Sequence, residues 1–127
     1  MNEQDQISQT IEAYLKAIKT GHPKHFKRAF YSDAVVINAG ETDIDKSVIP
    51  IADFAANVKK RHDDGVNVEE IPLGITINQV ANVGNVRVDF ELLIGETKLF
   101  GTDFFNIVKR NGEWRISQKI YDLTHTV

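Results

Sequence analysis

The order of hydrophobic patterns along this sequence predicts a single α+β domain, in which N-terminal helices pack on a curved antiparallel sheet that encloses an apolar pocket. Apolar residues recur every three or four positions in the first half of the chain. In the second half they alternate with polar residues over long runs, which is typical of strands. Because the helices precede the strands, the pattern favours α+β over a parallel α/β sheet. The 127 residues suit one domain, 1–127.

Three helices are expected. Residues 5–20 are predicted to be helical from the spacing of Ile7, Ile11, Tyr14, Leu15 and Ile18. Gly21 ends this helix, and Pro23 suits the first turn of a short second helix over 23–30. A polar loop is predicted over 39–48, and a third helix from Pro50 to Arg61.

Five strands are expected, because β-branched and alternating apolar residues fill the remaining segments. Their predicted ranges are Ala34–Asn38, Ile71–Asn78, Val86–Ile94, Thr97–Lys109 and Glu113–Leu123. Asn111-Gly112 is a strong hairpin signal, and Gly95-Glu96 is taken as the preceding turn.

The two turns predict a register, and opposed residues share a face of the sheet. The predicted pairs are Ile107 with Ile116, Phe105 with Gln118, Asp103 with Ile120, Val88 with Asp103, and Leu92 with Leu99. Both hairpins therefore place Asp103 on the apolar face that the helices cover. A bulge in either hairpin would shift this by one residue.

Composition excludes several functions. The chain has no cysteine, so disulfides, thiol catalysis and thiolate metal sites are ruled out. The net charge of −3 is spread along the chain, which gives no indication of a nucleic-acid partner. No apolar run approaches the roughly 18 residues of a membrane span, and the N-terminus lacks an apolar signal core. We expect a cytoplasmic protein with no cofactor and no metal.

The pattern of motifs resembles the NTF2-like superfamily over nearly the whole chain. The segments that carry the resemblance are AYLKAIKTG, AFYSDAVVINAG and GTDFFNIVKRNGEWRISQKIY. The second and third look most like the SnoaL-like and putative lumazine-binding branches. The resemblance implies a cone-shaped α+β fold with a deep pocket, commonly dimeric, and a lumazine- or flavin-related ligand is what the branch name implies. It does not imply one chemistry.

Ketosteroid isomerases, which belong to the same superfamily, provide a sharper comparison. Their oxyanion-hole Tyr and protonated Asp would fall on Tyr14 and Asp103. Their base would fall on Asn38, and their supporting Tyr on Ala55. Since an amide cannot take a proton from carbon at neutral pH, ketosteroid isomerisation is not expected.

Asp103 and Tyr14 are the candidate catalytic pair. The predicted register places Lys98, Arg115 and Lys119 on the opposite face. Burial without a cation disfavours a carboxylate, so we expect a neutral Asp103 that donates to a ligand oxygen. The alternative is that Asp103 hydrogen-bonds Tyr14 or backbone in a closed core.

The predicted ligand-binding set extends this pair along the same face. It comprises Tyr14, Asn38, Phe54, Val88, Phe90, Asp103, Phe105, Gln118 and Ile120. For Asn38 and Gln118 the alternative is an amide in water at a strand end. His22 and His25 lack a third metal ligand, so no metal site is assigned. Trp114 is expected to be a core anchor.

The outer face of strand 97–109 would carry Phe100, Phe104 and Val108, which is a large apolar surface to leave in water. We therefore expect a homodimer, with cover by a loop as the alternative.

Three functions remain open from the sequence. The leading one is binding of a small, partly apolar ring ligand. The second is a lyase or isomerase acting on a cyclic ketone through Asp103 and Tyr14. The third is a dimerisation module without a ligand.

Overall fold

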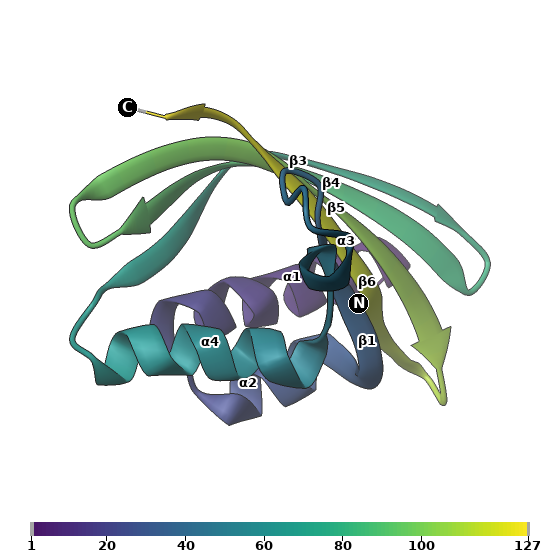
Figure 1. The fold of residues 1–127 in the computed structure, drawn as a ribbon. Helices are drawn as coiled ribbons and strands as arrows, with labels where there is room; N and C mark the ends of the chain where they lie inside the picture. The colour runs from purple at the N-terminus through teal and green to yellow at the C-terminus, as the bar shows by residue number, and fades with distance from the viewer. Residues whose placement is uncertain (1, 127) are drawn as a thin grey trace.

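The computed structural model describes residues 2–126 and has helices on the concave face of a six-stranded curved sheet (Figure 1). The helices are α1 (Glu3–Thr20), α2 (Pro23–Ala29), α3 (Ile44–Ser47) and α4 (Ile51–Asp63). The strands are β1 (Phe30–Asn38), β2 (Val48–Pro50), β3 (Val68–Val80), β4 (Val83–Ile94), β5 (Thr97–Arg110) and β6 (Glu113–Thr126). The predicted α+β class is confirmed. The predicted polar loop differs, because it contains α3 and leads into β2.

The first two helices lie close to their predicted ranges, although α1 begins two residues earlier than predicted and α2 ends one residue earlier. The side chain of Asn2 accepts a hydrogen bond from the Asp5 amide at the start of α1. Gly21 ends α1 in the left-handed region, with φ 69°, and its N–H donates to the Ala17 carbonyl. His22 Nδ1 then accepts from the Lys24 amide and Pro23 opens α2, so His22 is a helix-capping residue.

The strands lie in the order β2-β1-β6-β5-β4-β3. All neighbouring strands are antiparallel except β1 and β6, which are parallel. The expected sheet is therefore confirmed in its β3–β6 meander, and the parallel pair is an addition to it. This pair joins the N-terminal helical part to the C-terminal hairpin.

The helices and the concave face of the sheet form one core. Ile7, Ile11 and Ala17 of α1 are buried against Val86, Phe105 and Ile107 of the sheet. Trp114 is also buried, as predicted, and its Nε1 donates to Glu3 Oε2 over 2.7 Å. No helix within residues 2–126 is long and apolar enough to cross a membrane.

A bulge in β6 changes the predicted register of the last hairpin. Ile107 pairs with Ile116 as expected, but the next residues on β5 and β6 to pair are Asn106 and Gln118, which leaves Ser117 extra. The predicted pairs Phe105 with Gln118 and Asp103 with Ile120 are therefore wrong. Phe105 lies opposite Lys119, and Asp103 lies opposite Tyr121.

A second bulge lies in β3. Pro72 pairs with Phe90 and Gly74 pairs with Asp89, so Leu73 is the extra residue. As a result Glu70, on one side of the bulge, and Ile75, on the other, both lie on the concave face. The β4–β5 hairpin has no bulge, and the predicted pairs Val88 with Asp103 and Leu92 with Leu99 are confirmed.

Candidate functional site

The concave face brings together most of the side chains that the sequence assigns to a pocket. Tyr14, Val88, Phe90, Asp103 and Phe105 are all buried there, and Phe54 of α4 packs against them.

The remaining three predicted residues lie elsewhere or have local partners. Asn38 Oδ1 accepts from the Gly40 amide in the turn after β1. Gln118 pairs with Asn106 and Ile120 with Phe104, and Asn106 and Phe104 are both exposed residues of the convex face. The prediction that Gln118 and Ile120 face the pocket is therefore wrong, because the β6 bulge turns both outward.

Four ionisable side chains form a buried cluster on the concave face: Tyr14, Glu70, Asp103 and Lys119. Their exposed fractions are 0%, 6%, 0% and 3%. The Tyr14 hydroxyl donates to Glu70 Oε1 over 2.6 Å. Lys119 Nζ lies 3.2 Å from Asp103 Oδ1. We call this group the interior cluster.

Aromatic rings surround the Lys119 ammonium. Its Nζ lies 3.8 Å from the centroid of the Tyr121 ring, 5.2 Å from that of Phe54 and 5.7 Å from that of Tyr14. A cation over ring faces is attracted by their quadrupoles, most strongly where water is excluded. The rings and Asp103 together hold the cation on the concave face.

Glu70 carries the clearest electrostatic signature in the cluster. Its burial raises the pKa of the Glu70 carboxyl well above the ordinary 4.5, and the neighbouring Asp103 charge raises it further. Lys119 and the Tyr14 hydroxyl act in the opposite direction and are weaker. Burial, followed by Asp103 and Glu70, also raises the pKa of the Tyr14 phenol well above 10.0. At neutral pH the Tyr14 phenol is therefore neutral, and the raised pKa of Glu70 favours the protonated form of its carboxyl.

The structure removes the reason for expecting a neutral Asp103. That expectation required a concave face without a cation near Asp103, and the β6 bulge places Lys119 there. The carboxyl whose pKa is raised by burial is that of Glu70, which lies within hydrogen-bonding reach of Asp103.

The cluster has unused hydrogen-bonding capacity. Both carboxyl oxygens of Asp103 and Oε2 of Glu70 are buried, and none accepts a hydrogen bond with good geometry within residues 2–126. Buried polar atoms are usually satisfied, so such a group indicates a strained or functional site. Glu70 can donate a proton, Asp103 can accept an N–H, and Lys119 can donate to a carbonyl oxygen.

Glu70, Lys119 and Tyr121 are the members of this site that the sequence analysis missed. Pro72 and Gly74 gave a usable signal for Glu70, because proline and glycine inside a strand commonly mark a bulge. For Lys119 no comparable signal exists. Trp114, Ile116 and Ile120 fit one alternation, in which Gln118 is the single polar residue at an inward position.

We predict that Glu70→Gln abolishes a pH dependence of stability. A raised folded-state pKa means that the stabilising contribution is present below the unfolded value near 4.5 and is lost as pH rises through the folded value. Glutamine keeps the acceptor for Tyr14 but does not titrate. Urea unfolding from pH 4 to pH 9 should therefore show a declining unfolding free energy in the wild type and a flatter profile in the variant.

Glu69→Gln is the matched control, because Glu69 is adjacent, half exposed and paired with Lys19 on the surface. It should retain the wild-type slope. If the Glu70→Gln profile parallels that of the wild type, Glu70 does not hold the titrating proton.

Comparisons with solved structures show that many other proteins share this fold. An NTF2-like protein of unknown function from Methylobacillus flagellatus KT is 25% identical, with TM-score 0.73, covering 97% of this chain and 93% of that one. One from Shewanella baltica OS155, also of unknown function, is 23% identical, with TM-score 0.71 and coverages of 98% and 94%. A protein described as a putative scytalone dehydratase, from Novosphingobium aromaticivorans DSM 12444, is 18% identical, with TM-score 0.79 and coverages of 98% and 86%. These likenesses confirm the NTF2-like fold.

No curated protein matches the chain. The family described as "Putative lumazine-binding" matches residues 2–122, almost the whole sequence, and confirms the resemblance inferred from the motifs. This chain is therefore a member of the putative lumazine-binding family, with an NTF2-like fold.

Proposed function

We propose that the protein binds a small, partly apolar ring compound on the concave face, with the interior cluster as its polar anchor. The observation that carries the proposal is the buried Asp103 carboxyl, whose two oxygens can accept more hydrogen bonds than the Lys119 ammonium and the neighbouring Glu70 carboxyl supply. A ligand N–H would supply a further donor, and its ring would replace water at a site that is already largely apolar.

Half-buried apolar side chains that pack against the core provide a place for a ring. They are Ile49, Phe54, Leu92, Ile94 and Tyr121. Phe54 and Tyr121 already lie against the Lys119 ammonium, so a ring stacked there would be within reach of that cation. This arrangement supports a ligand that combines a flat apolar body with a carbonyl group.

A lumazine ring fits these requirements chemically. A pteridinedione carries an imide N–H, which Asp103 can accept, and carbonyl oxygens, to which Lys119 can donate. The family description supports the choice of this compound as the first probe.

We predict that lumazine binds saturably and that Tyr121→Ala weakens binding by about tenfold, since stacking on an aromatic ring contributes roughly 1–3 kcal/mol. Titration followed by the fluorescence of lumazine itself measures both affinities. Val80→Ala removes an exposed apolar side chain at the β3–β4 turn and serves as the control. Equal affinities of wild type and Tyr121→Ala would exclude binding at this position.

A lyase or isomerase acting on a cyclic ketone is the second candidate, and the raised pKa of Glu70 favours it. A carboxyl that stays protonated at neutral pH can act as a general acid toward a ketone oxygen. The Tyr14 hydroxyl, bonded to Glu70, would hold that carboxyl in position. Asp103 would then hold Lys119 in place, which differs from the catalytic role expected from the sequence.

Proton exchange separates binding from catalysis. An enzyme of this class should exchange the α-protons of cyclohexanone with D2O faster than buffer does, and Glu70→Gln should remove that excess rate. Proton NMR measures the exchange. If the wild type and Glu70→Gln both match the buffer rate, the catalytic candidate fails, whereas lumazine binding is unaffected by that result.

We further propose that the protein is a homodimer through the convex face of the sheet. The predicted outward residues Phe100, Phe104 and Val108 do lie on β5 facing away from the helices, and Phe104 is 43% exposed. The adjacent strands extend this patch through Ile120 and Ile37 to Val48, which is 48% exposed. Such a row favours burial against a second copy.

We predict that Phe104→Asp shifts the protein from dimer to monomer, because a carboxylate would have to be desolvated in the interface. Sedimentation velocity at micromolar concentration gives the oligomeric state. Val80→Asp places the same charge at an exposed apolar position on the β3–β4 turn and should leave the dimer intact. A wild-type protein that sediments as a monomer contradicts this proposal.

A further inference from the structure

A groove between α2 and α4 lies apart from the interior cluster. Its volume is about 670 Å³, and none of Tyr14, Glu70, Asp103 or Lys119 lines it. Its floor and walls are apolar, with Phe26, Phe30, Ile51, Ala52 and Ala56 among the lining side chains. This volume falls within the range of pockets that hold small molecules.

Small side chains keep the groove open. Ala52 and Ala56 lie one helical turn apart on α4, and both are exposed. Leucines at these positions would fill the space between the two helices. Covering exposed apolar surface of this kind with a hydrocarbon group is favourable in free energy.

Every charged side chain among the described residues that line the groove is basic. They are Lys27, Lys59 and Arg115, in a protein whose net charge is −3. Lys59 Nζ forms an ion pair with Asp63 Oδ2 over 2.5 Å. Within residues 2–126, Lys27 has no ion pair.

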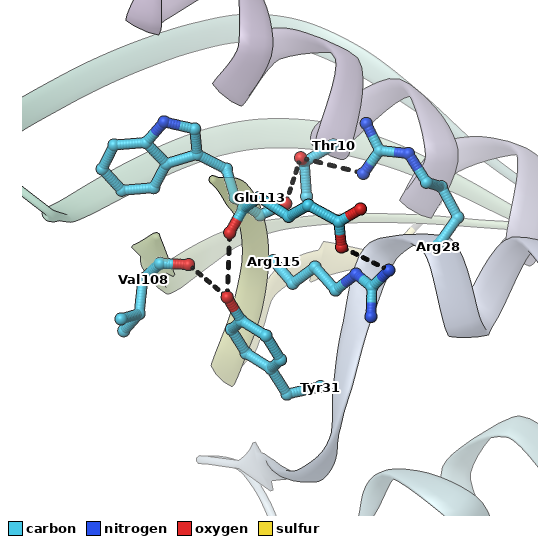
Figure 2. A network of polar contacts seen from close by, with 7 residues as sticks. Thr10, Arg28, Tyr31, Val108, Glu113 and Arg115 are labelled. Atoms are coloured by element: carbon cyan, nitrogen blue, oxygen red, sulfur yellow. Dashed lines mark hydrogen bonds and ion pairs between the residues drawn. The ribbon is translucent and has the colours of Figure 1, made fainter. Parts of the chain in front are cut away.

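Arg115 has a donor left over. Its Nη2 pairs with Glu113 Oε2 over 2.8 Å, while the buried Nε has no hydrogen-bond partner within residues 2–126. Figure 2 shows Arg115 extended beside Tyr31, whose hydroxyl donates to the carbonyls of Val108 and Glu113. A buried N–H of a guanidinium without an acceptor favours an anion at this end of the groove.

The first turn of α4 also lies at the groove, and its one acidic residue, Asp53, is outside the lining. Ile51 and Ala52, the first two residues of this 13-residue helix, line the groove. The preceding Pro50 provides no side-chain hydrogen bond to cap the helix. The free N–H groups of a helix start attract negative charge.

The opposite end of the groove is closed by Gly21 and carries Lys59, which is paired with Asp63. Gly21 packs so tightly on α4 that an added Cβ would lie 3.1 Å from the Lys59 Cα. Gly21 and Pro23 therefore meet the late part of α4, while Phe30 and Arg115 meet its start. Within residues 2–126, the cation at the closed end is thus paired, whereas Lys27 and the Arg115 Nε are not.

We propose that this groove binds an amphipathic monocarboxylate, a short fatty acid in chemical class, with its carboxylate at Arg115 and Lys27 and its chain along Ala52 and Ala56. The site is separate from the one on the concave face and does not depend on the function proposed there.

Decanoate and decylamine are the matched probes, because they share a chain and differ in the sign of the head group. On addition of decanoate below its micellar concentration, the Arg115 Nε–H resonance should shift in a saturable manner in ¹H–¹⁵N NMR spectra. Decylamine should bind at least roughly tenfold more weakly, since the lining cations repel it.

Two pairs of variants test the head-group and chain positions. Lys27→Glu should weaken decanoate roughly tenfold, whereas Lys24→Glu, the same change outside the lining on the same helix, should not. Ala52→Phe should block the groove, whereas Asn57→Phe, also on an exposed site of α4, should not. All four positions are exposed, so folding should be retained and circular dichroism verifies it.

The proposal is overturned if decanoate causes no saturable shift, if decylamine binds as tightly, or if each variant behaves like its control.

Discussion

The ion pair between Lys119 and Asp103 is the interaction on which the concave face depends. Two charges removed from water lose several kcal/mol of hydration each, and their attraction offsets this only with good geometry. Their distance of 3.2 Å and the rings around Lys119 supply part of that compensation. A fold with an apolar pair of equal volume in place of these two charges would often be as stable or more stable. Stability alone therefore does not account for the presence of the ion pair. The ligand binding proposed above would use the remaining hydrogen-bonding capacity of the interior cluster.

The raised pKa of the Glu70 carboxyl is linked to the same pair. With one carboxylate already compensated by one ammonium, a second buried negative charge has no cation of its own. Burial and the Asp103 charge therefore raise the pKa of Glu70, and Tyr14 fixes the orientation of the carboxyl by its hydrogen bond. Charge balance in a low-dielectric interior thus assigns distinct roles to two chemically similar side chains.

The fold was predictable because its signals are local, whereas the site depends on two single-residue irregularities. Helix spacing, the Gly21 stop and the Asn111-Gly112 turn each act within a few residues, and the elements they predict are present. Side chains alternate between the two faces along a strand, so one extra residue changes the face of every residue after it. The extra residue Ser117 therefore reverses the faces predicted for Gln118, Lys119 and Ile120. Asp103 was placed correctly because the β4–β5 hairpin contains no bulge. The bulge at Leu73 could have been suspected from Pro72 and Gly74, but the one at Ser117 interrupts a pattern that looks regular.

The parallel pairing of β1 with β6 has a consequence for how this chain folds. β1 has β2 on one side and β6 on the other, and the hydroxyl of Tyr31 bonds the Glu113 carbonyl, 82 positions away in the sequence. Closing a segment of that length costs chain entropy before any pairing energy is recovered, and non-local pairing of this kind slows folding. The helices and β1 can form early from local contacts, but their sheet edge stays unpaired until the β5–β6 hairpin reaches them. During that interval the apolar face of β1 is exposed, so the rate at which the C-terminal hairpin forms limits how long the nascent protein is prone to aggregate.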